Sequence, residues 1–301
     1  MQLRLSNAPC SWGIEFADNP NNPSPTRVLD EIAGAGYRAT ELGPLGYLPT
    51  DAGQLRDELA KRDLKLIAGT LFHHLHDRSR RDEILDFTRR SCKLLQQQGA
   101  EYMVVIDHVV SPRTDQAGQV ESATRLSDTD WQSMMETIRQ ASQICHEHQI
   151  TPVLHAHTGT YIEYRDELDR AMNDLDEKLV SLCVDTGHCL YAGMDPAEVI
   201  RSYGDRLRYL HFKDINPAVH QQVLAEGIDF YNAISNGVFC PLGQGAVDFA
   251  QIRQALQSIE YDGWVTVEQD MDPTLDANPL NNARNSREFI EQALMAVQPA
   301  A

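Results

Sequence analysis

Residues 180–188 read Val-Ser-Leu-Cys-Val-Asp-Thr-Gly-His, a short apolar run that ends abruptly in a polar cluster. This pattern is typical of a buried strand of a parallel sheet whose C-terminal end opens into a polar loop. It recurs along the chain, and an amphipathic stretch follows most of the copies. Eight such runs can be counted: Leu3–Ala8, Ala39–Leu42, Lys65–Phe72, Tyr102–Asp107, Thr151–His155, Val180–Asp185, Leu207–Phe212 and Trp264–Glu268.

The segments between these runs carry the periodicity of amphipathic helices. Examples are Pro25–Ala35, Ala52–Arg62, Asp82–Gln98, Asp128–His148 and Pro196–Tyr203. Strands that alternate with helices over 301 residues, with no Ser/Gly linker, predict a single α/β domain over residues 1–301, a (β/α)8 TIM barrel. An open doubly wound sheet is the second interpretation, but no glycine-rich dinucleotide fingerprint follows the first run.

One segment, Asn216–Gly245, breaks this alternation between the seventh run and the next helix. It is far longer than an ordinary strand-to-helix connection, and such loops in compact domains tend to be lids or binding loops. Because the segment is rich in apolar residues, we expect it to pack over the catalytic face of the barrel. The alternative is that it packs beside the barrel and mediates contacts between copies of the chain.

The charge balance argues against several classes of partner. The chain has 44 Asp and Glu against 26 Lys and Arg, for a net charge of −18, so neither nucleic acid nor an anionic membrane is expected to bind. No apolar run reaches the roughly 20 residues that span a bilayer, and the N-terminus does not resemble a secretory signal. The six cysteines do not have the paired short spacings of a zinc ribbon or of a redox motif. A cytoplasmic protein with free thiols is therefore expected.

The polar ends of the last four runs predict a metal site. In a TIM barrel the catalytic residues stand at the C-terminal ends of the strands. The fifth to eighth runs end in His155, Asp185, His211 and Glu268, which can converge near the barrel axis. Imidazole and carboxylate together suit a divalent ion such as Mn, Co, Zn or Fe, whereas an all-oxygen set would favour Mg or Ca.

Three further residues near these ends can transfer protons. Lys213 lies two positions beyond His211 and therefore faces the same way along its strand. Its ammonium can donate a proton or hold a substrate oxygen. His157 has the same relation to His155, and His188 follows Asp185 by three residues. Either histidine can bind substrate, transfer a proton or orient a ligand of the ion.

The ends of the second to fourth runs carry polar side chains as well. These are Glu41, His73, His74, Asp107 and His108. We expect Glu41, His73, Asp107 and His108 to bind substrate, and Glu41 in particular to accept hydrogen bonds from the hydroxyls of a polyol.

At these residues the sequence resembles the inosose dehydratase family of inositol catabolism, a branch of the xylose-isomerase-like barrels of sugar isomerases and epimerases. The resemblance covers nearly the whole chain. The stretches that carry it are Asn7–Gly13, Gly36–Gly43, His155–Thr160, Val184–His188, His211–Asp214, Gly237–Phe239, Pro241–Gly245 and Gly263–Glu268. The motif over residues 73–76, His-His-Leu-His, does not match a pattern of the dehydratases.

The resemblance implies a lyase that removes water from a cyclic keto-polyol such as 2-keto-myo-inositol (scyllo-inosose). It also implies a bound divalent ion, Mn or Co first and Zn, Fe or Mg as alternatives. The usual metal set of the superfamily corresponds here to Asp185, His211 and Glu268, with a histidine, His155 or His157, in place of the glutamate that many relatives have as the fourth ligand. The ion would polarise the ketone, His157 or His188 would transfer the α-proton, and Lys213 would act as acid or stabilise the enolate.

Three rival functions remain at this point. A keto-sugar isomerase or epimerase would use the same barrel and the same ion. A phosphodiester hydrolase on this barrel would need more ligands and a basic groove, opposite to the charge of this chain. A polyol-binding protein without activity would not need all four predicted ligands. A homo-oligomer is compatible with each of these functions.

Overall fold

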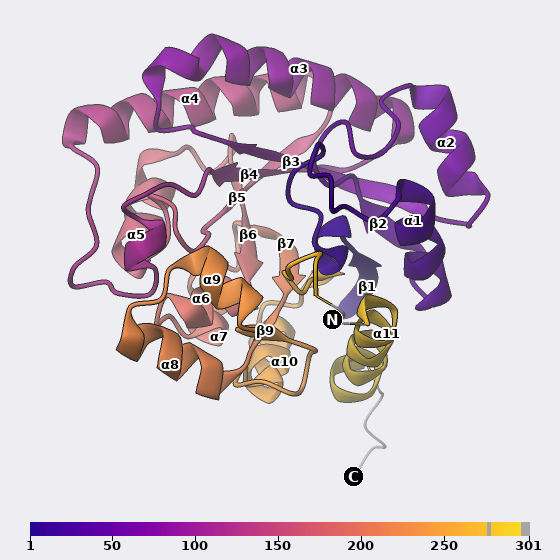
Figure 1. The fold of residues 1–301 in the computed structure, drawn as a ribbon. Coiled ribbons are helices and arrows are strands. Elements are labelled where there is room, and N and C mark those ends of the chain that lie inside the picture. The colour runs from indigo at the N-terminus through magenta and orange to yellow at the C-terminus, as the bar shows by residue number, and fades with distance from the viewer. Residues whose placement is uncertain (276–277, 296–301) are drawn as a thin grey trace.

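Eight parallel strands close into a barrel surrounded by helices in the computed structural model, which describes residues 1–275 and 278–295 (Figure 1). Around the barrel the strands follow the order β1-β10-β7-β6-β5-β4-β3-β2. They are β1 (Gln2–Asn7), β2 (Ala39–Glu41), β3 (Lys65–His73), β4 (Tyr102–Asp107), β5 (Thr151–His155), β6 (Ser181–Asp185), β7 (Leu207–Phe212) and β10 (Asp262–Val267). Each of the eight predicted strands is confirmed within two residues, and the TIM barrel is confirmed with them.

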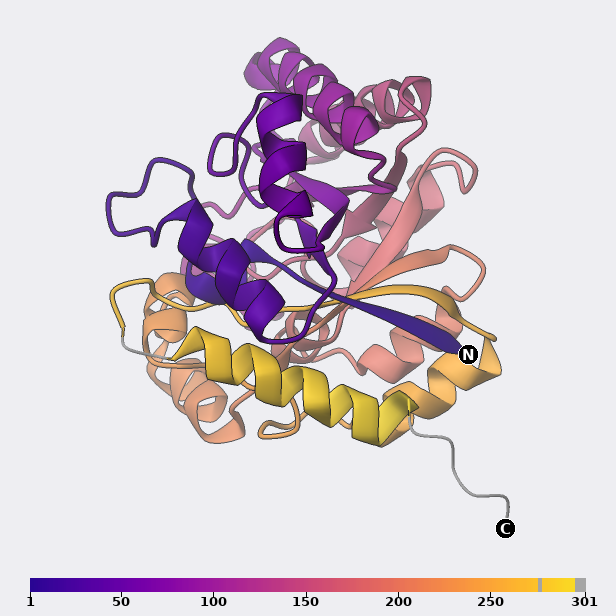
Figure 2. The same ribbon diagram turned by 90° about the vertical axis from the view of Figure 1, so that its right-hand side faces the viewer.

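The helices cover the outside of this barrel. They are α1 (Pro25–Gly34), α2 (Ala52–Ala60), α3 (Arg81–Gln98), α4 (Asp128–Glu147), α5 (Arg165–Asp174), α6 (Thr186–Tyr191), α7 (Pro196–Ser202), α10 (Phe249–Ser258) and α11 (Pro279–Ile290), with short turns η1 (Pro9–Trp12), η2 (Arg78–Arg80), η3 (Thr114–Gln116) and η4 (Glu291–Met295). The last helix returns to the start of the chain and packs against α1 (Figure 2). The five helices named from the sequence are confirmed.

Two of these helices around the barrel were not predicted from the sequence. In α5 the apolar face is small, because Leu168, Ala171 and Met172 are its only buried apolar side chains. In α6 the helix begins directly after a strand, at Thr186, with the Asp185 side chain accepting from the amide of His188.

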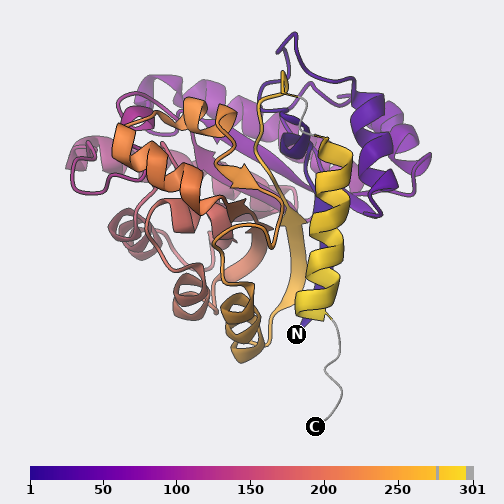
Figure 3. The ribbon, with the colours of Figure 1, turned by 60° about the horizontal axis from the view of Figure 1, so that its bottom comes forward.

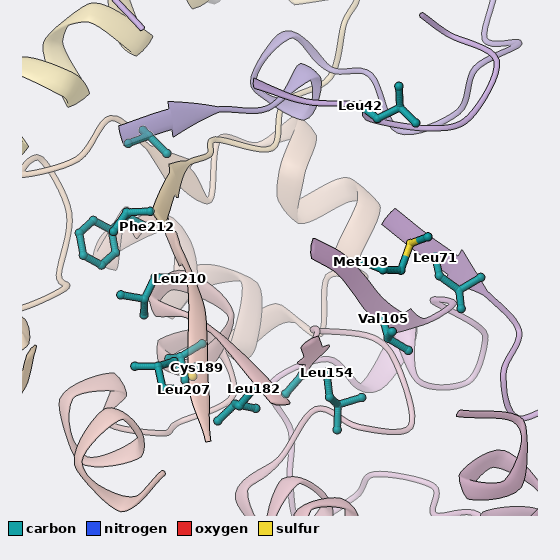
Figure 4. Close-up of a cluster of buried hydrophobic side chains, with 14 of the residues drawn as sticks. Leu42, Leu71, Met103, Val105, Leu154, Leu182, Cys189, Leu207, Leu210 and Phe212 are labelled. Atoms are coloured by element: carbon teal, nitrogen blue, oxygen red, sulfur yellow. The ribbon is translucent and has the colours of Figure 1, made fainter. Parts of the chain in front are cut away.

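Alternation along the strands divides the core into two layers. In β4, Val104 and Ile106 belong to the cluster inside the barrel. Their neighbours Met103 and Val105 belong to the larger layer between strands and helices, part of which is drawn in Figure 4. Successive side chains of a strand point to opposite faces, so counting residues along a strand shows whether the side chain at its end points into the barrel or toward the helices.

The long segment after β7 folds into its own small unit. It holds β8 (Asp214–Ile215), α8 (Pro217–Glu226), α9 (Phe230–Ser235) and β9 (Phe239–Cys240), and β8 pairs antiparallel with β9. The two helices lie side by side in Figures 1 and 3 and bury their own apolar cluster, which includes Phe230 and Phe239. The Asp214 carboxylate accepts three amides of the returning chain, and this anchors the unit beside the strand ends.

The six cysteines are free thiols, as expected. Within residues 1–275 and 278–295, no helix has both the length and the apolar character needed to cross a membrane.

Candidate active site

The four predicted metal ligands occupy the inward-facing ends of neighbouring strands. Asp185 and His211 are direct partners in the register of β6 and β7. Glu268 follows β10, and its amide donates to the Phe212 carbonyl at the end of β7. All four ligands are buried, with at most 7% of any residue exposed. The side-chain alternation predicted from the sequence therefore brings them to one end of the barrel.

Three of these side chains form a cluster with the spacing of a metal site. The His155 Nε2 atom lies 3.6 Å from Asp185 Oδ2, and His211 Nδ1 lies 3.8 Å from the same oxygen. Ligands about 2.1 Å from a tetrahedral ion would be ~3.4 Å apart. Both Asp185 Oδ2 and His211 Nδ1 are buried without a hydrogen-bond partner among the described residues, which an ion between them would resolve. The donor set fits a divalent ion.

Glu268 contributes from the other side of His211. Its Oε2 atom lies 3.2 Å from His211 Nδ1, and it groups with Glu41 and His211 as a second triad of potential ligands. The four predicted residues, together with Glu41, thus form two overlapping triads that share His211. Burial would raise the pKa of the Glu268 carboxyl, but His211 and Lys213 lower it to about 2, so this group is ionised at neutral pH.

Glu41 orients the shared histidine. Its Oε1 atom accepts hydrogen bonds from His211 Nε2 at 2.9 Å and from the Tyr209 hydroxyl at 2.7 Å. A proton on Nε2 leaves His211 Nδ1 free to bind an ion, which is the usual effect of a carboxylate behind a ligating histidine. The predicted polyol contact of Glu41 stays a prediction, because the residue lines the cavity but one oxygen is already engaged.

Lys213 stands among carboxylates beside the metal cluster. Its ammonium lies 2.8 Å from Asp270 Oδ2, 3.2 Å from Glu268 Oε2 and 3.5 Å from Asp185 Oδ2. Burial would lower the pKa of this amine, but Asp185, Asp270 and Glu268 outweigh it and raise the pKa above its usual value. A charged lysine is thus held at the cavity wall, with the proton that acid catalysis needs.

The two histidines proposed for proton transfer occupy different positions. His157 lines the cavity, and its Nδ1 donates to the Thr158 carbonyl at 2.8 Å, so Nε2 is a free acceptor. Burial lowers the pKa of His157 to about 3, and the imidazole is neutral. His188 is only 1% exposed and does not line the cavity; its Nε2 accepts from Lys213 at 3.0 Å.

A cavity of about 610 Å³ opens above this cluster. Its walls come from the strand ends, the loop after β1, helix α9 and residues 270–273. The unit formed by the long segment therefore supplies one wall of the cavity through α9.

Comparison with known proteins identifies the family. A family model for the xylose isomerase-like TIM barrel matches residues 29–293. An inosose dehydratase of Geobacillus kaustophilus is 35% identical over 96% of this chain and 94% of its own length. The chain belongs to the inosose dehydratase family. Solved structures agree on the fold, with a TM-score of 0.73 and 16% identity to the zinc-bound IolI protein, covering 97% of this chain and 98% of that one.

A D-allulose 3-epimerase of Methylomonas sp. has the same fold, with a TM-score of 0.70, 19% identity and 97% of each chain covered. At such identity the likeness concerns the fold alone.

Three of the residues at the ends of β3 and β4 form an aromatic wall of the dehydratase cavity. His73, His74 and His108 all line it. The His108 ring stacks on Phe72 with centroids 4.4 Å apart and on His74 at 4.3 Å. Substrate contact by His73 and His108 stays a prediction that this placement allows.

Asp107 is placed differently from what the sequence predicts. It is 1% exposed and is not among the described residues that line the cavity. Its two oxygens lie 2.8 and 3.0 Å from His76 Nδ1, and it accepts the amide of Tyr161. The expectation of direct substrate contact is therefore corrected: Asp107 joins two loops beneath the cavity wall.

Sequence reasoning gave no role to Asp270, although this residue approaches Lys213 most closely. It lies two positions beyond Glu268, the same spacing that singled out Lys213 after His211. That signal was available. The partnership itself, between residues 57 apart in the chain, follows only from the neighbouring positions of β7 and β10.

Proposed function

We propose that this chain is a metal-dependent hydro-lyase that removes water from a cyclic keto-polyol, with 2-keto-myo-inositol as its simplest substrate. The observation that carries the proposal is the buried His155, Asp185 and His211 triad, with unpartnered donor atoms, beside the charged amine of Lys213. Membership in the inosose dehydratase family supports the reaction class.

The proposed metal set is His155, Asp185, His211 and Glu268, loaded with Mn or Co, with Zn, Fe or Mg as alternatives. When bound, a divalent ion polarises a ketone oxygen and makes the neighbouring C–H bond more acidic. His155 is assigned as the fifth-strand ligand because its Nε2 atom faces Asp185, whereas His157 groups with His188 and Asp270.

The side chains of the wall carry out the proton transfers in this proposal. The free Nε2 of His157 takes the proton from the carbon next to the ketone, and a neutral imidazole is required for this step. The Lys213 ammonium gives a proton to the β-hydroxyl as its C–O bond breaks. One C–H and one C–O bond are lost, a C=C bond forms and one water leaves, so no oxidant or reductant is needed.

His188 and Asp270 position the acid. The His188 Nε2 atom lies 3.0 Å from the Lys213 ammonium, and the hydroxyl and the amide of Thr158 lie 2.9 and 3.3 Å from its Nδ1. With Asp270 on the other side, the amine is fixed in direction and remains charged until it donates. His188 therefore acts through Lys213 in this proposal and does not touch substrate.

A keto-sugar epimerase is the second candidate, because the allulose epimerase has the same fold. The two reactions share abstraction of the α-proton and differ in its fate. An epimerase returns the proton to carbon and needs no acid aimed at a leaving hydroxyl. The Lys213 ammonium, which Asp270 and Glu268 hold at the cavity wall, favours elimination.

The test is an assay of metal-loaded protein with 2-keto-myo-inositol, combined with elemental analysis of the purified protein. Elimination leaves an enol that tautomerises to a dione with new ultraviolet absorbance, and elemental analysis should find about one ion per chain. Epimerised product, or solvent deuterium in recovered substrate without dione, would assign the chain to the second candidate.

A further inference from the structure

The cavity is larger than the ring proposed to react in it. A six-carbon keto-polyol has about 12 non-hydrogen atoms, and at the ~30 Å³ that a water molecule occupies in the liquid these take roughly 360 Å³. The cavity measures about 610 Å³, which lies in the range of pockets that hold drug-sized ligands, so space for a second ring remains beyond the first.

The walls of this remaining space include several large apolar side chains. We call it the outer compartment, and it is lined by Phe16, Leu45, Phe87, Tyr231, Ile234 and Met271. The inner end, by contrast, is lined by histidines, carboxylates and Lys213. A fully hydroxylated ring gains nothing from apolar walls, because each buried hydroxyl needs a hydrogen-bond partner. The outer compartment is therefore built for a different chemical group.

Two aromatic side chains of the compartment stay exposed to solvent. Phe16 is 39% exposed and Tyr231 is 38% exposed, and both are among the six exposed large apolar side chains in residues 1–275 and 278–295. They come from the loop after β1 and from α9, and the Tyr231 hydroxyl donates to Glu15 at 3.0 Å. Exposed aromatic side chains at the rim of a cavity are typical of a binding site for a ligand.

The charged groups of the compartment argue against an anionic ligand. The Arg80 guanidinium is already paired with Glu83 through two contacts, at 2.9 and 3.1 Å. Glu15, Asp18 and Asp272 also line the cavity. Carboxylates therefore outnumber the cations that face this space, and a carboxylate or phosphate on the ligand would be repelled.

We propose that the outer compartment binds an uncharged aromatic group carried by the keto-polyol ring, so that the natural substrate is an aryl-substituted keto-polyol. The inference rests on the proposed function for the orientation of the ring, whose keto end lies at the metal cluster. The elimination itself is unchanged, with the same proton and hydroxyl leaving as water.

Calorimetric titration of the metal-loaded protein with two unreactive probes, myo-inositol and its monobenzyl ether, tests this proposal. Burial of the benzyl ring should make the ether bind about tenfold tighter or more. The Phe16→Ser and Ile234→Ser variants should each lose most of that difference and leave the affinity for myo-inositol unchanged. Val120→Ser is the matched control, because Val120 is 43% exposed and does not line the cavity.

Equal affinity of the two probes, or a preference that survives in both compartment variants, would overturn the proposal. So would tighter binding of a 4-carboxybenzyl ether than of the benzyl ether. If Phe16→Ser dissociated a dimer and the native protein did not prefer the benzyl ether, the outer compartment would instead be assigned to contacts between copies of the chain. Because the probes do not react, these results are independent of the dione assay, and failure of one test leaves the other intact.

Discussion

The two histidine groups at the strand ends contain the same residue type but differ in their partners. The inner group is His155, His157, His188 and His211, and the outer group is His73, His74, His76 and His108. In the inner group, carboxylates and Lys213 face the imidazoles. In the outer group, each ring packs against an aromatic side chain or another imidazole.

The protonation state of each histidine depends on the side chains beside it and not on which of the two groups it belongs to. Burial lowers the pKa of His73 to about 4 and also lowers that of His74 and His108. For His211 burial acts in the same direction, but Cys183, Glu268 and Glu41 raise the pKa above its usual value. His73, His74 and His108 are therefore neutral wall residues, whereas His211 without an ion holds a second proton that an ion bound at Nδ1 would displace.

The largest effect is expected from Asp185, the carboxylate on which the inner group converges. Asp185→Asn keeps an oxygen to cap α6 but removes the charge that an ion needs. Turnover should fall on the order of 10³-fold and bound metal should be lost, as measured by the dione assay and elemental analysis. The exposed Asp205→Asn is the control. Full metal content with normal turnover would separate the inner group from metal binding.

Removal of Lys213 should separate chemistry from metal binding. In Lys213→Ala and Lys213→Met, we expect turnover to fall by about 10² to 10⁴, because the proton for the leaving hydroxyl is gone. Bound metal should be retained, since the ligand set is intact. Near-normal turnover in both variants would remove Lys213 from the mechanism.

Glu41 should affect metal affinity more than chemistry. Glu41→Ala removes the acceptor that directs His211, and the affinity for the ion should fall about 10- to 100-fold. At saturating metal, most of the turnover should return. A loss of turnover that excess metal does not restore would show that Glu41 contacts the substrate, as the sequence predicts.

The outer group should tolerate substitution. His74→Ala removes a neutral ring that no carboxylate pairs with, so metal content should be unchanged and KM should rise less than about tenfold. Steady-state kinetics and elemental analysis measure both. Loss of the ion in this variant would contradict the distinction between the two groups.

The smallest effect concerns His76, the one outer histidine paired with a carboxylate. Burial would lower its pKa, but the hydrogen bond and charge of Asp107 raise it above 6.5. Its protonation therefore stabilises the fold below pH 6.5, and this contribution is lost as the pH rises through the folded pKa. Urea unfolding at pH 6 and pH 8 should show this small loss in the native chain and not in His76→Gln. An equal pH dependence in both would refute the pairing.

Much of the barrel could be predicted from the sequence because strand ends are marked locally. Each apolar run stops at a polar cluster, and alternation alone places His155, Asp185, His211 and Glu268 inside. The helix α5 was missed because its buried face is small. Asp107 was misplaced because nothing in a single strand shows that His76 would turn back to engage it.

The amino-acid sequence by itself determined which residue types stand at the ends of the strands, since hydrophobic periodicity is a property of the local chain. Tertiary structure decided which atoms meet. The proton position on His211, the carboxylates around Lys213 and the apolar wall of the outer compartment all join residues from different strands and loops. Such contacts depend on barrel closure and on the packing of the long segment, which no local pattern encodes.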